Sequence, residues 1–235
     1  MKYLGSKNRI AKEILPIILK ERGERTWVEP FVGGANMIDK VNGNRIASDS
    51  NEYVIALLQE MSNENFIAPE ITESEYNKIK NNKDEYPKWI VGYAGTQLSF
   101  GSTWFGSYRR DAKGKRNYCL EARSNVDKQA VKLKGIAFYN CKYNELDIPP
   151  NSLIYCDPPY DTQATKGKYK DAFNHNEFWN WCREKTKQGH IVFVSEYKAP
   201  SDFECVWQME MKQRMNNAVQ TKNTIEKLFK CNNLL

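Results

Sequence analysis

Short apolar runs alternate with amphipathic segments along most of the chain. Runs rich in β-branched and aromatic residues predict strands at 26–31, 45–48, 136–139, 153–156, 191–194 and 225–229. Apolar residues recur at helical spacing between several of these runs, which predicts helices over 8–20, 53–61 and 176–187 and a helix beginning at 37–41. This alternation is typical of an α/β fold, with a mostly parallel sheet covered by helices on both faces.

The pattern changes between residues 63 and 135. Polar residues, glycines and aromatic residues replace the apolar runs there, and no clear strand is predicted. We interpret this stretch as an insertion into the α/β fold. The expected division is one domain formed by 1–62 and 136–235, with 63–135 as a small inserted region.

The composition narrows the possible partners. The chain has 35 Lys and Arg residues and 29 Asp and Glu residues, a formal charge of +6 that mildly favours a polyanionic partner. Its six cysteines are spread singly, without a Cys-x-x-Cys pair, so we expect no metal site. No apolar stretch approaches the roughly 18 residues that a membrane-spanning helix requires, and the start of the chain lacks the apolar run of a signal peptide. We expect a cytoplasmic protein with reduced thiols and no membrane attachment.

The sharpest chemical signal is the tetrapeptide Asp157-Pro158-Pro159-Tyr160, which directly follows the predicted strand 153–156. Open α/β sheets bind ligands at the carboxyl ends of their strands. The prolines stiffen the loop, and the Asp157 carboxylate and the Pro158 carbonyl can both accept hydrogen bonds from one amino group. Two such acceptors would favour a pyramidal nitrogen, and so stabilise the transition state of transfer to the weakly nucleophilic exocyclic amine of a base. Tyr160 offers a face on which the base can stack.

A second signal begins at Glu29, where a predicted strand passes through Phe31 into the glycine turn Gly33-Gly34. Glycines let the backbone approach a ligand closely, so we expect a cofactor against this turn. The spacing is not the Gly-x-Gly-x-x-Gly of dinucleotide-binding proteins, which argues against a nicotinamide or flavin. Asp49 ends the next predicted strand, where a carboxylate can accept hydrogen bonds from both hydroxyls of a ribose.

These elements resemble, in type and order, the Dam-like (D12 class) DNA adenine methyltransferases, in the small, phage-associated branch of that family. The resemblance covers nearly the whole chain. Its elements are an aromatic-x-Gly-x-Lys start (Tyr3 to Lys7), a Phe-x-Gly turn (Phe31 to Gly34), an acidic strand end (Asp49), an inserted target-recognition region (63–135) and the Asp-Pro-Pro-Tyr loop (157–160). Many relatives have Phe-x-Gly-x-Gly, whereas Ala35 stands at the last of these positions here, so the backbone groups that meet the cofactor stay open.

The resemblance implies a Rossmann-like fold that binds S-adenosyl-L-methionine, extrudes an adenine from double-stranded DNA and methylates its N6 amino group. It implies that Tyr3 and Lys7 contact the methionine end or the adenine of the cofactor, that Asp49 binds its ribose, and that Asp157 lies close to its methionine amino group. Tyr143 stands where similar enzymes place an aromatic ring against the cofactor's adenine, with Tyr139 as a competitor. The implied setting is the cytoplasm of a bacterial or phage-infected cell, in or outside a restriction-modification system.

Candidate DNA contacts concentrate in the inserted region. Five cations lie within the eight positions 109–116, beside aromatic residues and glycines. Cations can contact phosphates, and aromatic side chains or arginines can fill the space left by an extruded base. The candidate residues are Ser107, Tyr108, Arg109, Arg110, Lys113, Lys115 and Arg116, with Lys166 and Lys168 in a second basic loop after the tetrapeptide.

Residue types separate the competing activities. Transfer to C5 of cytosine requires a cysteine nucleophile, typically in a Pro-Cys step, and no cysteine in this chain follows a proline. Glutamine methylation goes with an Asn-Pro-Pro-Tyr loop, which Asp157 disfavours. Transfer to N4 of cytosine, more often with Ser at this position, and transfer to an adenine in RNA both stay open. A non-catalytic DNA-binding protein is disfavoured because Asp157, Tyr160 and the glycine turn are all present.

Overall fold

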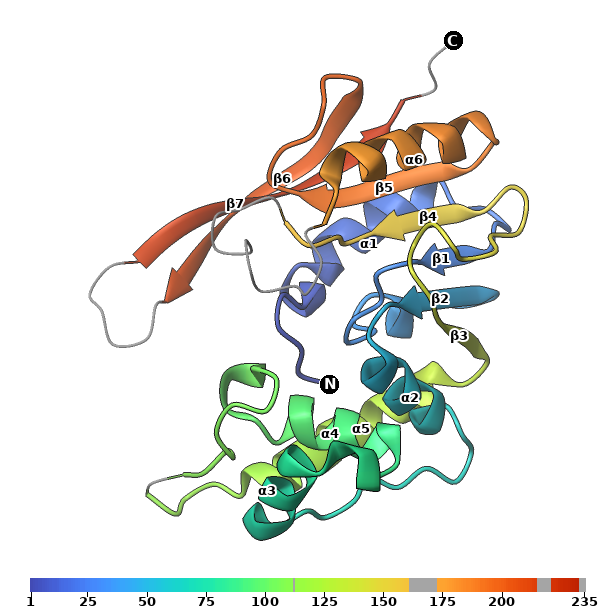
Figure 1. Ribbon diagram of the computed structural model, residues 1–235. Helices are drawn as coiled ribbons and strands as arrows, with labels where there is room; N and C mark the ends of the chain where they lie inside the picture. Colours follow the sequence, from blue (N-terminus) through green and yellow to red (C-terminus); the bar gives the residue numbers. More distant parts are fainter. Residues whose placement is uncertain (112, 161–172, 215–220, 233–235) are drawn as a thin grey trace. The chain divides into compact units, whose positions relative to one another are not determined.

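The computed structural model describes residues 1–111, 113–160, 173–214 and 221–232 (Figure 1). The chain forms two compact units, each built from two separate stretches of sequence. The first unit comprises Met1–Lys12 and Phe31–Leu146, and the second comprises Glu13–Pro30 and Asp147–Leu235.

The described part of the first unit contains two parallel strands and four α-helices. β2 (Arg45–Asp49) pairs with β3 (Ile136–Asn140), with Arg45 opposite Ile136 and Asp49 opposite Asn140. The α-helices are α2 (Glu52–Met61), α3 (Glu73–Asn81), α4 (Lys88–Gln97) and α5 (Tyr118–Leu133). Short 3-10 turns are η1 (Lys7–Arg9), η2 (Ile38–Lys40), η3 (Lys83–Glu85) and η4 (Phe100–Ser102).

Local sequence explains where these helices begin and how two of them pack. The side chains of Asn51, Thr72 and Asn117 accept hydrogen bonds from first-turn N–H groups of α2, α3 and α5, as good N-cap residues do. In α4, a Cβ atom on Gly92 would lie 2.2 Å from the carbonyl oxygen of Tyr53 in α2. Glycine at this position therefore lets the two helix backbones approach closely.

The described part of the second unit contains five strands in the order β1-β4-β5-β7-β6. β1 (Trp27–Glu29), β4 (Leu153–Cys156) and β5 (Ile191–Glu196) are parallel. β7 (Thr221–Cys231) pairs with β5 in the antiparallel direction and also with the edge strand β6 (Phe203–Arg214). In Figure 1, α6 (His175–Lys187) lies in front of these strands and α1 (Ala11–Lys20) lies behind them. The buried strand β4 is thus held between two parallel neighbours, with its carboxyl end at Cys156.

The α/β fold class expected from the sequence is confirmed, because most strand pairs are parallel and α-helices lie between β2 and β3 and between β4 and β5 along the chain. All six predicted strands are present, and the helices expected over 8–20, 53–61 and 176–187 correspond to α1, α2 and α6. The helix expected to begin at 37–41 is wrong: only η2 forms there, between a left-handed Ala35 (φ 54°) and an extended Val41.

Two further features were not anticipated. β6 has charged residues interspersed along its length, which suits an edge strand but obscures the apolar run. The inserted region, for which the sequence predicts no clear strand, is largely helical and contains the whole of α3, α4 and α5. Residues 63–135 belong to the first unit, together with 31–62 and 136–146. The functional division into a domain and an insertion stays a prediction.

The described residues also bear on membrane, metal and thiol chemistry. None of their helices is long and apolar enough to cross a membrane. They hold no group of three or more His, Cys, Asp or Glu side chains arranged to bind a metal ion. The six cysteines are free thiols, and three of them, Cys156, Cys182 and Cys231, are buried. Burial raises the pKa of the Cys182 thiol, so this side chain behaves as a small apolar residue.

Candidate functional site

The glycine turn belongs to the first unit and is tied to the end of β2. The Val32 N–H donates to the Ser48 carbonyl (2.9 Å), and the Gly33 N–H donates to Oδ2 of Asp49 (3.0 Å). Gly33 (φ 45°) and Ala35 (φ 54°) both adopt the left-handed backbone conformation, so the chain reverses tightly. The turn therefore fixes the carboxylate of Asp49 against its own backbone.

Tyr3 explains why positions 33 and 34 are both glycine. A Cβ atom on Gly33 would lie 2.7 Å from Cε1 of Tyr3, and a Cβ atom on Gly34 would lie 2.6 Å from Cβ of Tyr3. A larger residue at either position would displace the tyrosine. Lys7 follows in the same N-terminal segment, is 8% exposed, and donates from Nζ to the Gly5 carbonyl (3.1 Å). The structure thus brings Tyr3 onto the glycine turn.

Asp49 uses both carboxylate oxygens within the protein. Oδ2 accepts from the Gly33 N–H, and Oδ1 accepts from the Asn51 N–H (2.9 Å). Burial raises the pKa of Asp49, and the two backbone hydrogen bonds oppose that rise because they favour the ionised form. Each carboxylate oxygen has a second lone pair, so the oriented side chain can also accept hydrogen bonds from two neighbouring hydroxyls.

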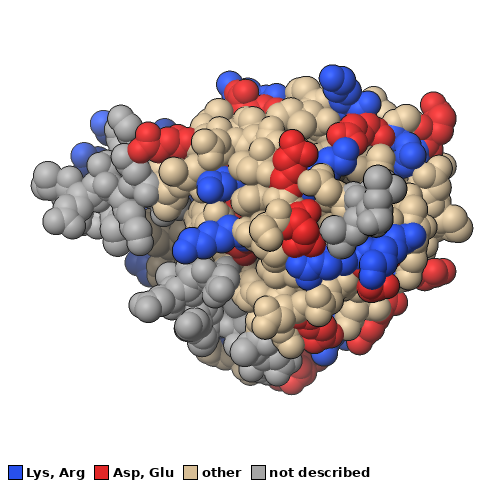
Figure 2. Space-filling view, turned by 90° about the horizontal axis from the view of Figure 1, so that it is seen from above, with Lys and Arg blue, Asp and Glu red and all other residues tan. Residues whose placement is uncertain are grey.

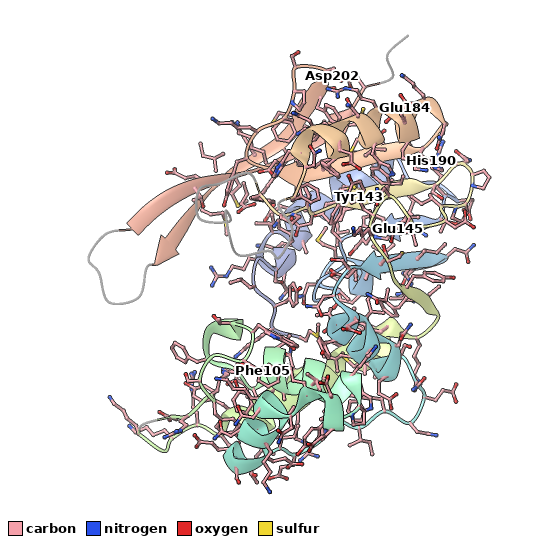
Figure 3. All side chains as sticks on the ribbon, in the orientation of Figure 1. Phe105, Tyr143, Glu145, Glu184, His190 and Asp202 are labelled. Atoms are coloured by element: carbon pink, nitrogen blue, oxygen red, sulfur yellow. The ribbon has the colours of Figure 1, made fainter. Side chains whose placement is uncertain are left out.

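Tyr143 stacks on the first residue of the turn segment. Its ring centroid lies 5.2 Å from that of Phe31, with an interplanar angle of 25°. Figure 3 labels Tyr143 in the segment that follows β3. The competing Tyr139 lies on β3 with 49% of its surface exposed. Of the two tyrosines weighed from the sequence, Tyr143 is the one in contact with the turn segment, which supports its assignment.

Glu29, the remaining cofactor candidate, ends β1 in the second unit. It is 3% exposed, and its Oε1 accepts a hydrogen bond from Nε1 of Trp27 (2.8 Å). This bond gives the carboxylate a structural role, because a buried carboxylate must be compensated. Its expected contact with a cofactor stays a prediction.

The Asp-Pro-Pro-Tyr loop leaves the second unit at the carboxyl end of β4. All four residues of β4 are buried, whereas Asp157 is only partly buried. Pro158 is buried, and Pro159 and Tyr160 are partly buried. The loop therefore starts from a rigid strand and presents its polar groups at the strand end, as the sequence predicts.

Three side chains that the sequence did not single out as catalytic hold this loop. Nε2 of His175 lies 2.9 Å from the Pro159 carbonyl oxygen, and the Tyr160 hydroxyl donates to Oε2 of Glu226 (3.0 Å). The ring of Tyr160 also packs edge-on against Tyr197, with centroids 4.6 Å apart. Burial raises the pKa of Tyr160, which keeps its hydroxyl a donor. The orientation of the Tyr160 ring is thus set by the ring contact with Tyr197 and by the hydrogen bond of its hydroxyl to Glu226.

The proposed DNA-contacting residues fall into two groups. In the first group, side chains are used within the protein: the Tyr108 hydroxyl donates to the Ile71 carbonyl (2.9 Å), and Arg110 pairs with Glu73. The Arg109 side chain is 12% exposed and lies over the ring of Tyr118, 4.4 Å from its centroid. Ser107, although exposed, is held through its carbonyl, which accepts from the Phe100 N–H (2.8 Å).

The second group is exposed and surrounds one aspartate. Oδ1 of Asp111 accepts from the Lys113 N–H (3.1 Å), and Oδ2 accepts from the N–H groups of Lys115 and Arg116 (2.8 Å each). These backbone hydrogen bonds lower the pKa of Asp111. The side chains of Lys113, Lys115 and Arg116 are all exposed on this shaped turn. Lys166 and Lys168 lie outside the described residues.

Aromatic side chains dock the segment before this basic turn onto α4. A Cβ atom on Gly95 would lie 2.6 Å from Trp104 and 2.8 Å from Phe105, so both rings pack directly on the helix backbone. Phe105 is 6% exposed and also contacts Tyr76, with centroids 5.5 Å apart (Figure 3). The segment therefore has a fixed aromatic base and an exposed basic end.

Charge elsewhere is mixed. On the face drawn in Figure 2, Lys and Arg are interspersed with Asp and Glu. A net charge of +6 therefore gives no single basic patch on that face. The local arrangement around Asp111 is a more specific indication of a polyanionic partner than the overall charge.

Comparison with known proteins points in one direction. Residues 3–91 match the family model described as D12 class N6 adenine-specific DNA methyltransferase. This stretch contains the N-terminal segment, the glycine turn and Asp49, and it ends before the Asp-Pro-Pro-Tyr loop. The chain is also 27% identical over 209 residues to the type II methyltransferase M.FokI of Planomicrobium okeanokoites. That alignment covers 78% of this chain and 32% of the relative, so the chain spans about a third of the relative's length.

Two solved structures resemble the chain more distantly. The rRNA methyltransferase aviRa from Streptomyces viridochromogenes is 11% identical, with 97% of this chain and 86% of that chain covered and a TM-score of 0.45. The 23S rRNA methyltransferase ErmE is 10% identical, with 97% of this chain and 70% of that chain covered and a TM-score of 0.34. The likeness to D12 class N6 adenine-specific DNA methyltransferases rests on the family match over residues 3–91.

Proposed function

We propose that the protein is a site-specific DNA adenine-N6 methyltransferase that uses S-adenosyl-L-methionine and acts on an adenine extruded from double-stranded DNA. The observation that carries this proposal is the Asp157-Pro158-Pro159-Tyr160 loop at the end of the buried strand β4. The D12 match over 3–91 and the 27% identity to M.FokI support the choice of adenine in DNA.

The residues of the first unit suit the proposed cofactor. Asp49 is oriented by two backbone hydrogen bonds and can accept from the vicinal hydroxyls of a ribose. Gly33 and Gly34 let Tyr3, an expected cofactor contact, pack directly on the turn. The stacked rings of Phe31 and Tyr143 provide an aromatic surface that suits an adenine. When bound, S-adenosyl-L-methionine supplies an electrophilic methyl group for direct displacement.

The residues of the second unit suit the acceptor amine. The Asp157 carboxylate and the Pro158 carbonyl accept hydrogen bonds from the exocyclic amino group and favour its pyramidal form, in which the lone pair is available. Tyr160, held by Glu226 and Tyr197, stacks on the extruded base. The proton of the amine leaves to solvent after transfer, and no covalent intermediate on the protein is needed.

The test is to incubate the protein with labelled S-adenosyl-L-methionine and unmethylated duplex DNA, and then to digest the DNA to nucleosides. We expect the label in N6-methyl-2′-deoxyadenosine. With Asp157→Ala we expect no labelled nucleoside. A parallel incubation with structured RNA distinguishes the two nucleic acids. Label in N4-methylcytosine, label in RNA alone, or no transfer would each overturn the proposal.

Several finer points belong to the same proposal. Double-stranded DNA is the expected partner, with Lys113, Lys115 and Arg116 as phosphate contacts. The expected setting is the cytoplasm of a bacterial or phage-infected cell. The likeness to M.FokI, a type II methyltransferase, favours a link to restriction-modification.

A further inference from the structure

Gln97, the last residue of α4, pairs with the backbone of the N-terminal segment. Its Nε2 donates to the Lys2 carbonyl (2.9 Å), and its Oε1 accepts from the Lys2 N–H (3.0 Å). One carboxamide thus satisfies both backbone groups of Lys2, as a neighbouring strand would. Nε2 also lies 2.8 Å from Oγ1 of Thr96, and Gln97 is only 1% exposed. Every polar atom of this buried side chain is therefore engaged.

Gln129, on α5, holds the glycine turn in a similar way. Its Nε2, which carries two hydrogens, shares them among three acceptors, the carbonyls of Gly34 (3.0 Å) and Ala35 (3.2 Å) and Oδ2 of Asp39 (3.0 Å). Gln129 is 4% exposed, and its Oε1 accepts from the amino group of Met1. Ala35 has a left-handed backbone, which a residue other than glycine adopts only when its surroundings stabilise it.

The hydrogen bonds of Gln97 and those of Gln129 both support the contact of Tyr3 with the glycine turn. Gln97 fixes Lys2, the next residue Tyr3 lies on Gly33 and Gly34, and Gln129 holds the far side of that turn. The ion pair of Lys2 with Glu121 adds little, because both side chains are more than a third exposed. The order of the N-terminal segment therefore depends on buried amides from α4 and α5, which both lie in the region 63–135.

We propose that Gln97 and Gln129 are positioning residues for the cofactor site. They hold Tyr3 and the glycine turn in the arrangement that binds S-adenosyl-L-methionine, so the inserted region contributes to cofactor binding as well as to DNA contact. This inference rests on the proposed function for the identity of the cofactor. Its geometry lies entirely within the first unit.

A merely structural glutamine would lower stability without changing the cofactor affinity of the folded protein. The test therefore measures the dissociation constant of S-adenosylhomocysteine by calorimetry, on the full chain and at a temperature where circular dichroism shows each variant folded. Gln97→Met and Gln129→Met keep the length of the side chain and remove its hydrogen bonds. Gln59→Met is the control, because Gln59 donates to the Phe138 carbonyl (2.9 Å) away from the turn.

We expect the dissociation constant to rise about tenfold in Gln97→Met and Gln129→Met and to change less than twofold in the control. The KM for S-adenosyl-L-methionine should rise in parallel, with kcat at saturation kept within about twofold. Amide exchange of Lys2 should accelerate in Gln97→Met, since the acceptor of that N–H has been removed.

A second pair of variants avoids the buried side chain altogether. Lys2→Pro removes the N–H that donates to Gln97, whereas Lys2→Ala keeps that N–H and removes the side chain beyond Cβ with its ion pair to Glu121. We expect weaker S-adenosylhomocysteine binding in Lys2→Pro alone. Unchanged affinity in folded Gln97→Met and Lys2→Pro would overturn the inference, while wild-type protein that binds neither S-adenosylhomocysteine nor S-adenosyl-L-methionine would overturn the proposed function itself.

Discussion

The glycine turn and the Asp-Pro-Pro-Tyr loop are built in opposite ways. The loop is four consecutive residues, placed by one buried strand and braced by His175 and Glu226. The turn is completed by residues from across the first unit, including Tyr3, Asp49 and Gln129. The groups proposed to act on the amine therefore lie in one continuous stretch of sequence. The surface proposed to bind the cofactor is assembled from residues far apart in the sequence.

This difference separates two kinds of mutational effect. A change in the loop should remove stabilisation that exists only in the transition state, and so lower kcat. A change around the turn should alter how well a preformed surface fits its ligand, and so alter affinity. The predictions that follow test this separation, beginning with the largest effect.

Asp157→Ala should abolish transfer. Removing a preorganised acceptor from the reacting amine is expected to lower kcat by at least about 10³-fold. Single-turnover transfer measures the loss, and a filter or fluorescence assay should find DNA binding within about threefold of wild type. Tyr160→Phe is the comparison, because it keeps the ring and removes only the bond to Glu226. An Asp157→Ala enzyme with more than a tenth of wild-type kcat would contradict the catalytic assignment.

Gly34→Ala should weaken cofactor binding with much less effect on kcat at saturation. The new Cβ would lie 2.6 Å from Cβ of Tyr3 and from Nδ2 of Asn36, so the tyrosine has to move. Overpacking of this kind costs about 1–3 kcal/mol, which corresponds to a rise of roughly five- to 150-fold in the dissociation constant of S-adenosylhomocysteine. Gly106→Ala is the matched control, because its Cβ would meet no atom closer than 3.6 Å. Equal affinity in both variants would show that Tyr3 does not shape the site.

Cofactor affinity should depend on the protonation of Asp49. Because burial raises its pKa, Asp49 begins to take up a proton at a higher pH than an ordinary aspartate, and the protonated carboxyl loses acceptor capacity. Affinity for S-adenosylhomocysteine should therefore fall on acidification, by about tenfold per pH unit below that pKa. Calorimetry from about pH 8 to about pH 4.5 would trace the fall. In Asp49→Asn the affinity should be lower and nearly independent of pH, and a parallel pH dependence in both proteins would exclude this role.

The smallest effect concerns the basic turn. Lys115→Gln should reduce the salt dependence of DNA binding by about one phosphate contact, a change of about 0.9 in the slope of log K against log salt. Arg109→Gln should change the slope less, because its guanidinium lies over Tyr118 and is 12% exposed. Titrations at several salt concentrations give the slopes, with Lys20→Gln on α1 as the charge-matched control. If Arg109→Gln had the larger effect, the two groups of candidate residues would have to be exchanged.

The sequence predicted the contiguous elements well. β4 is an apolar run and β5 begins with one, over 191–194, so both strands and the loop that follows β4 could be recognised. α4 could not be recognised, because Gly92 and Gly95 weaken a helical pattern. Only the structure shows that Gly92 makes room for the backbone of α2 and Gly95 for the rings of Trp104 and Phe105.

The roles of the buried amides could not be predicted from the sequence, for a related reason. Gln97 and Gln129 look like ordinary polar helix residues, and their value depends on which backbone groups tertiary structure brings to them. The role of Glu226 was equally hidden, because it is one of several charged residues on β7. A motif of consecutive residues can be recognised from the residue types alone. The distant side chains that hold such a motif in place can be identified only once the fold is known.

The two glutamines that hold the N-terminal segment set limits on how target specificity can be exchanged between enzymes. Gln97 ends α4 and Gln129 lies within α5, so the stretch 99–116, which lies between them, contains neither. A graft confined to 99–116 would bring new nucleic-acid contacts into a host whose cofactor site is left whole. A graft of all of 63–135 would replace both amides, and it would succeed only if the donor carries glutamines that fit the host's first three residues and its glycine turn.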